Sequence, residues 1–306
     1  MGVRLVVAVT DRDWFETLRR VPVLEEVNFW APGGAPFKAL SPGELFVFKL
    51  HAPDNFIVGG GVFAHSSSMP CSLAWEAFGL ANGATSLAEM RRRIGKYRKV
   101  DPGKREDFVI GCRVLTQPFF LDEFEWLSVP KSWSPNIVTL KSYSTDDAEG
   151  LELWERVRSR LAAQPRLAGL GEADRFGAPA LVRPRLGQGA FRMVVTDQYQ
   201  RRCAVTNERT LPALEAAHIV PYAEGGSHEP SNGLLLRRDI HSLLDAGYVT
   251  VTPEMHFEVS RRIKEEFENG RDYYRLNGNP VSHPLSKDAW PSPARLRWHN
   301  ENSFLG

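Results

Sequence analysis

The sequence has little cysteine, almost no net charge and no long apolar run. Its three cysteines, Cys71, Cys112 and Cys203, are odd in number and far apart, which argues against a disulfide scaffold and for a reducing cytoplasm. Lys and Arg total 38 against 37 Asp and Glu. This balance excludes a polycationic coat protein but not a nucleic-acid enzyme with local basic patches. No apolar run reaches the roughly 18–20 residues of a membrane span, so we expect no membrane partner.

What the chain does have is the ordinary composition of a globular protein, 42% hydrophobic and 25% charged. Residues 1–146 alternate aromatic and β-branched stretches with Pro- and Gly-rich turns, and helices are predicted near 72–78 and 86–99. This pattern predicts an α+β domain with a curved, barrel-like sheet and inserted helices. A helix and a Gly-, Ala- and Pro-rich linker at 147–180 then lead to a second domain at 181–306. The strands predicted in the first domain are 4–10, 44–50, 56–64, 108–115 and 137–143.

The stretch from Cys203 to Val251 carries the most informative pattern. A short predicted strand ends on His218, a sharp Gly-containing turn follows, and a second predicted strand begins after Asn232. Asp239 is placed to cap a helix starting near residue 240 that carries His241 in its first turn. The sequence therefore predicts a β-hairpin packed on a helix, with two imidazoles and one amide around a small space.

That grouping suits hydrolysis of a phosphodiester. A neutral imidazole can take the proton of a water molecule as the water attacks phosphorus. A divalent cation bound beside this base stabilises charge on the phosphoryl oxygens and on the leaving 3′ oxygen. An Asn side chain can hold the hairpin loop and orient the histidine through hydrogen bonds to backbone.

The segments AHIVPYAEGG, SNGLLL and DIH, at these intervals, resemble the HNH nuclease family of the ββα-metal fold. By position the resemblance implies that His218 is the general base, Asn232 a structural residue and His241 a metal ligand. The implied ion is Mg²⁺, with Mn²⁺, Co²⁺ or Ni²⁺ as substitutes. The resemblance covers about residues 183–251 well and the rest of the second domain loosely.

Two positions depart from the family pattern. Many members carry Asp or His directly before the general base as a second metal ligand, but Ala217 cannot bind a metal. Glu215, on the same strand face, or Asp239, near the helix start, are the candidate replacements, and we prefer Glu215. Many members also hold a structural zinc with two CxxC pairs, whereas this segment has only Cys203. We therefore expect no structural zinc and a hairpin held by apolar packing.

The other histidines of this half of the chain carry weaker signals. We expect His228, His256, His283 and His299 to be surface residues or satisfied core residues. Asp245 is expected only to help end the helix, so we assign it no chemistry.

Basic side chains near both candidate sites are predicted to contact phosphates. Guanidinium pairs well with phosphate, and nearby glycines permit close approach to the DNA backbone. A solvated charged face is the alternative for each of them. The predicted DNA contacts are Arg183, Arg185, Gln188, Arg237, Arg238, Arg91, Arg92 and Lys96.

In the first domain, the segments NFWAPGG, PGELFVFK and IVGGGVF resemble the PUA-like superfamily, especially its EVE branch, over about residues 3–143. The resemblance implies a pocket for a flipped or modified base. An extruded base must be sandwiched by flat apolar groups and recognised by a few polar ones. Our pocket candidates are Trp30, Asn28, Phe29 and Trp75.

Readers of this kind fused to HNH occur in modification-dependent (type IV) restriction endonucleases. The implied activity is metal-dependent cleavage of double-stranded DNA that carries modified cytosine. One HNH site cuts one strand, so double-strand cleavage suggests a homodimer. The alternatives are a nonspecific or nicking nuclease, or one that acts on RNA. A modified-DNA binding protein with an inactive HNH fold is a further alternative, to which Ala217 gives weight.

Overall fold

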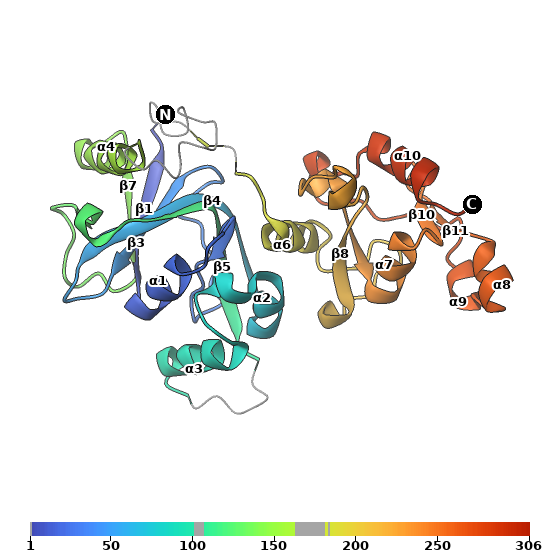
Figure 1. Cartoon of the computed structure of the whole chain (residues 1–306), viewed down its shortest axis with the longest axis horizontal. Coiled ribbons are helices and arrows are strands. Elements are labelled where there is room, and N and C mark those ends of the chain that lie inside the picture. The colour runs from blue at the N-terminus through green and yellow to red at the C-terminus, as the bar shows by residue number, and fades with distance from the viewer. Residues whose placement is uncertain (1, 101–106, 163–180, 183) are drawn as a thin grey trace. The chain divides into compact units, whose positions relative to one another are not determined.

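The computed structural model describes residues 2–100, 107–162, 181–182 and 184–306 (Figure 1). It divides the chain into two compact units, 1–187 and 188–306. The linker predicted around 164–180 and Arg183 lie outside the described residues. No helix in the described ranges is long and apolar enough to cross a bilayer.

The first unit is built on a seven-stranded sheet with the strand order β2-β5-β4-β3-β1-β7, and β6 pairs with β4. Strands β1 and β3 are parallel, and the other pairs are antiparallel. In the part of the chain that the structure describes, the end strands β2 and β7 do not pair, so the sheet does not close into a barrel. The predicted mixture of α and β is confirmed, but the predicted barrel is not seen. The strands are β1 (Arg4–Thr10), β2 (Glu26–Asn28), β3 (Leu45–Leu50), β4 (Phe56–Pro70), β5 (Val109–Phe120), β6 (Leu127–Ser128) and β7 (Leu140–Ser144).

Helices cover both faces of this sheet, as Figure 1 shows for α1 and α4. Neighbouring residues of a strand point to opposite faces, and Phe46 and Val47 of β3 accordingly belong to different core clusters. Trp14 of α1 packs with the cluster of Phe46, and Trp154 of α4 packs with that of Val47. Helix α4, in the segment predicted to connect the domains, therefore contributes to the core of the first unit. The helices are α1 (Arg12–Arg19), α2 (Cys71–Phe78), α3 (Leu87–Arg98) and α4 (Ala148–Ala162).

The second unit contains the predicted hairpin and helix. Strands β8 and β9 pair antiparallel, with His218 opposite Gly233, and α7 follows β9 directly. Apolar side chains of the hairpin and helix form one core in which Cys203 is fully buried. The strands are β8 (Leu214–His218), β9 (Gly233–Arg237), β10 (Val249–Val251) and β11 (Phe257–Val259). The helices are α6 (Gln188–Gln198), α7 (Arg238–Asp245), α8 (Arg262–Phe267), α9 (Arg271–Tyr274) and α10 (Pro293–Asn302).

The start of α7 differs from the prediction. The helix begins at Arg238, with Arg237 as its N-cap residue, and no side chain caps it. Asp239 therefore lies inside the first turn rather than at the cap, where its carboxylate still favours the positive end of the helix dipole.

Candidate functional site

His218 ends β8 and lies partly buried against α6. Its ring stacks on Phe191, with ring centroids 4.0 Å apart and an interplanar angle of 11°. Burial, and then the nearby imidazoles His228 and His241, lower the pKa of His218 to about 4. The ring is therefore neutral at neutral pH, which is the form that can accept a proton.

A glycine makes room for this stack. Gly233 pairs with His218 across the hairpin, and a Cβ on Gly233 would lie 2.5 Å from Val195 and 3.0 Å from the Phe191 ring. The first distance is shorter than real contacts and the second is tight, so a larger residue at position 233 would require these side chains of α6 to shift. The Gly after Asn232 in the SNGLLL segment thus allows α6 to press Phe191 against His218.

Asn232 is fully buried and closes the loop between the two strands. Its Oδ1 accepts from the Val220 N–H at 2.9 Å, and its Nδ2 donates to the Val220 and Ser227 carbonyls, each at 2.9 Å. Asn232 therefore influences the site through the backbone of the loop that it holds. Because Ser227 directly precedes His228, the amide fixes the part of the loop that lies over the histidine of β8.

His228 was expected to be an ordinary surface or core residue, but the structure places it at the site. Its Nδ1 lies 3.0 Å from Nε2 of His218, and its ring stacks on Tyr222 with centroids 4.7 Å apart. The one sequence signal that could have singled it out is its position in the loop between His218 and Asn232.

His241, in the first half of α7, lies between two carboxylates. Its Nδ1 is 2.9 Å from Oε2 of Glu215, and its Nε2 is 3.3 Å from Oδ2 of Asp245, one turn further along the helix. Nε of Arg238 is 3.1 Å from the other oxygen of Glu215. Asp245, to which the sequence assigned no chemistry, thus contacts the same imidazole as Glu215.

Asp239 faces different partners. Its Oδ1 accepts from Nε of Arg237 at 3.0 Å, and its Oδ2 accepts from the Tyr273 hydroxyl at 3.2 Å. The hydrogen bond from Arg237 holds the pKa of Asp239 below its usual range. The structure therefore brings Glu215, and not Asp239, into contact with His241.

The donor set around His241 suits a hard divalent cation. Within the described ranges, no group of three or more His, Cys, Asp or Glu side chains is arranged as a preformed metal site. Mg²⁺ commonly binds through only one or two protein carboxylates and keeps several waters or phosphate oxygens. An imidazole flanked by Glu215 and Asp245 fits that mode of binding.

The predicted DNA contacts fall on three surfaces of the two units. Arg185 and Gln188 are exposed just before and at the start of α6, and Arg238 is exposed beside Glu215. Arg92 and Lys96 are exposed on α3. Three of the predicted contacts have acidic partners: Arg237 pairs with Asp239, Arg238 with Glu215, and Arg91 lies 3.9 Å from Asp107.

Two of the four base-pocket candidates are core residues. Phe29 is only 7% exposed and packs on Phe46 and Phe48, with centroids 4.8 and 5.9 Å away. Its ring is packed into the core of the sheet, so it is not available as a wall of an open pocket. Asn28 is fully buried and donates to Oδ1 of Asn82 at 2.9 Å.

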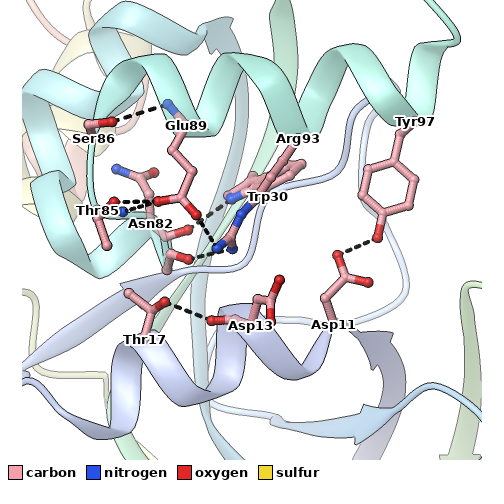
Figure 2. A network of polar contacts seen from close by, with 11 residues as sticks. Asp11, Asp13, Thr17, Trp30, Asn82, Thr85, Ser86, Glu89, Arg93 and Tyr97 are labelled. Carbon is pink, nitrogen blue, oxygen red and sulfur yellow. Dashed lines mark hydrogen bonds and ion pairs between the residues drawn. The ribbon is translucent and has the colours of Figure 1, made fainter.

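Trp30 lies at the edge of the first unit's core, where Figure 2 shows it among polar groups of α1 and α3. Its indole N–H donates to the Asn82 carbonyl at 2.9 Å, and its ring meets Tyr97 edge to face at 6.5 Å. Tyr97 is 44% exposed and donates to the Asp11 carboxylate, and burial together with Asp11 raises its pKa. Trp75, on α2, is partly buried. Tyr97 was missed because it stands inside the basic run.

The depressed pKa of His218 predicts how the stability of the second unit depends on pH. An unfolded histidine titrates near pH 6.5, so between about pH 6.5 and 4 the unfolded chain binds more protons than the folded one. The contribution of the neutral His218 ring to the free energy of unfolding is therefore fully present above about pH 6.5 and is lost as the pH falls toward 4. We expect urea midpoints, measured in EDTA, to fall from pH 7 to pH 4.5, with a shallower fall in His218→Gln. If the urea midpoints of the two proteins fell equally with pH, the lowered pKa of His218 would be contradicted.

Comparison with known proteins finds one family. A family model described as HNH endonuclease matches residues 203–252, whereas no curated protein matches the chain. Among solved structures, ASCH from Zymomonas mobilis is 8% identical, covers 49% of this chain and 94% of its own, and has a TM-score of 0.31. The modification-dependent TagI restriction endonuclease is 12% identical, covers 92% of this chain and 76% of its own, and has a TM-score of 0.30. At these TM-scores neither likeness decides the fold or the activity.

The matched segment contains β8, the loop after it, β9 and α7. It therefore includes His218, Asn232 and His241 together with the side chains that contact them. Residues 203–252 match the HNH endonuclease family, and this match supports a nuclease.

Proposed function

We propose that this protein is a divalent-metal-dependent HNH endonuclease that cleaves double-stranded DNA marked by a modified base, with modified cytosine as the first candidate. The observation that carries the nuclease chemistry is a neutral imidazole, His218, held beside the group formed by Glu215, His241 and Asp245. It supports a site with a proton acceptor next to ligands for a cation.

In this proposal His218 removes the proton from the attacking water, and Asn232 holds the loop that surrounds it. His241, with Glu215 and Asp245 on either side of its ring, would hold the cation. A bound Mg²⁺ or Mn²⁺ supplies charge stabilisation for the phosphoryl and leaving 3′ oxygens. A carboxylate on one ring nitrogen also fixes the tautomer of His241 and leaves the other nitrogen to act as ligand.

The DNA backbone is proposed to contact exposed basic side chains of both units and the amide of Gln188. Arg185 lies just before α6 and Gln188 is its first residue, and Arg238 pairs with the carboxylate of Glu215. On the first unit, Arg92 and Lys96 lie one helical turn apart on the exposed side of α3. Contacts of this type position DNA without recognising its sequence. Because one such site cuts one strand, we expect two copies to act on a duplex.

Recognition of the modified base is proposed for the first unit, at Trp30. Its likeness to PUA-like readers, together with a partly exposed indole beside Tyr97 and Asp11, supports a stacking surface with a polar group close by. Asn28 would support this surface indirectly. It donates a hydrogen bond to the side chain of Asn82, and the backbone carbonyl of Asn82 accepts from the Trp30 indole. Trp75 remains a second candidate wall, whereas Phe29 is left out because it is part of the core.

Digestion of matched duplexes tests the proposal. Identical DNAs with cytosine, 5-methylcytosine or 5-hydroxymethylcytosine are incubated with Mg²⁺ or Mn²⁺, and with EDTA as the metal-free control. We expect cleavage of at least one modified duplex, much weaker cleavage of the plain duplex and none in EDTA. Equal cutting of all duplexes would indicate a nonspecific nuclease. Tight binding of modified DNA without cutting would indicate an inactive reader.

Trp30→Ala is expected to reduce the preference for modified DNA by about 10-fold, since base–aromatic stacking contributes roughly 1–3 kcal/mol per base. The affinity for unmodified DNA should change little, because phosphate contacts do not involve this ring. Competition binding with the two duplexes measures both quantities. Trp30→Phe, which keeps a flat ring, serves as the matched variant and should retain most of the preference. An unchanged preference in Trp30→Ala would place the pocket elsewhere.

A further inference from the structure

The HNH site contains a second imidazole that directly contacts the first. Nε2 of His218 and Nδ1 of His228 are 3.0 Å apart, which is hydrogen-bond distance. Each ring is also held by an aromatic stack: Phe191 lies on His218 at an interplanar angle of 11°, and Tyr222 lies on His228 at 7°. The two rings therefore meet in one defined orientation.

The loop that presents His228 is tied down on both sides. Before it, the Ser227 carbonyl accepts from Asn232. Arg295 of α10 donates to Oγ of Ser227 at 3.1 Å and to Oε2 of Glu229 at 2.7 Å, on either side of the histidine. A side chain clamped in this way is preorganised and does not need to be ordered when DNA binds.

A hydrogen bond between two neutral imidazoles fixes which nitrogen of each ring carries the proton. One ring must donate its N–H and the other must accept with its lone pair. If His218 donates through Nε2, its lone pair is on Nδ1, and among the described residues no group hydrogen-bonds to that atom. If His228 donates instead, Nδ1 of His218 carries the proton and the ring has no lone pair left for water.

We propose that His228 is a positioning residue that accepts the Nε2–H of His218 and so holds the general base in the tautomer whose Nδ1 lone pair takes the proton from water. This inference rests on the proposed role of His218 as the general base. His228 itself does not touch the reacting atoms. Its effect is on the orientation and protonation state of its neighbour, as is usual for partners of catalytic histidines.

Three substitutions at His228 separate hydrogen bonding from packing. His228→Phe keeps a flat ring for Tyr222 but has no acceptor. His228→Asn can place a carbonyl oxygen near the position of Nδ1, whereas in His228→Gln the carbonyl lies one bond further out. We expect kcat to fall about 10- to 100-fold in the Phe and Gln variants, and to recover in the Asn variant to within about threefold of wild type. The Kd for DNA should stay constant, and the exposed His256→Asn serves as the control.

Nitrogen-15 NMR of the histidine side chains gives a second readout that does not depend on catalysis. His218 is expected in the Nε2–H form in the wild-type protein and in a mixture of tautomers in His228→Phe. Wild-type kcat in the Phe variant, failure of the Asn variant to recover, or an Nδ1–H form of His218 in the wild type would each overturn the assignment. Full cleavage by His218→Ala would instead reject the general base itself, and with it the proposed chemistry.

Discussion

His218→Ala is expected to lower the rate of DNA cleavage by about 10²- to 10⁴-fold and to leave the Kd for DNA within about twofold of wild type. The substitution removes the ring that is neutral at neutral pH and is held against Phe191. Hydroxide or bulk water must then replace the positioned base. Cleavage of a modified duplex in Mg²⁺, and binding of the same duplex in Ca²⁺, measure the two effects separately.

Two controls make this result specific to the proposed chemistry. The same truncation at His283, whose ring stacks on Trp290, should leave cleavage unchanged. Added imidazole should restore part of the activity of His218→Ala, because the substitution leaves a space of the same shape beside Phe191. A near-normal cleavage rate in His218→Ala would exclude this residue as the general base.

Asn232→Ala is expected to lower the free energy of unfolding of the second unit by roughly 3 kcal/mol or more and to abolish cleavage. The side chain is fully buried and makes three hydrogen bonds to the backbone of Val220 and Ser227. Each buried polar group left without a partner costs about 1–3 kcal/mol. Because the same bonds set the course of the loop before His228, the site should lose its geometry together with its stability. Urea unfolding and duplex cleavage measure the two losses.

Asn232→Asp distinguishes the loss of hydrogen bonds from the loss of volume. A carboxylate can still accept from the Val220 N–H, but its second oxygen would face the Val220 and Ser227 carbonyls. We therefore expect this variant to be at least as unstable as Asn232→Ala, although it keeps the size of the side chain. Truncation of the exposed Asn279 should change stability by about 0.5 kcal/mol or less. Wild-type stability in either Asn232 variant would contradict the structural role.

The HNH motif was predictable from the sequence because it is local. His218, Asn232 and His241 all fall within one hairpin and the helix that follows it, and the family match covers the same segment. Strand alternation, a Gly-containing turn and helical periodicity are short-range properties, so they indicate where the motif residues lie in their elements. The mixture of α and β in the first unit was predictable for the same reason. Helix α1 was not predicted, although its eight residues make it as long as α2, which was.

What the residues touch was decided by tertiary packing. Phe29 and Trp30 are neighbours in the sequence, yet Phe29 belongs to the core and Trp30 lies at its edge, because successive side chains leave opposite faces of the extended chain. His228 contacts His218 from a loop whose neighbouring Ser227 is hydrogen-bonded by Asn232 and by the distant Arg295.

By itself, the sequence determined the strands, the helix and the motif residues of the nuclease, since these depend on chain-local geometry and residue type. Glu215 was also preferred over Asp239 from its place on the strand that ends on His218, whereas the tertiary structure alone decided that α4 joins the core of the first unit and that Asp245 contacts His241. Those outcomes depend on side-chain directions and on contacts between distant segments. Such contacts form only when the apolar surfaces are buried together, and no local pattern encodes them.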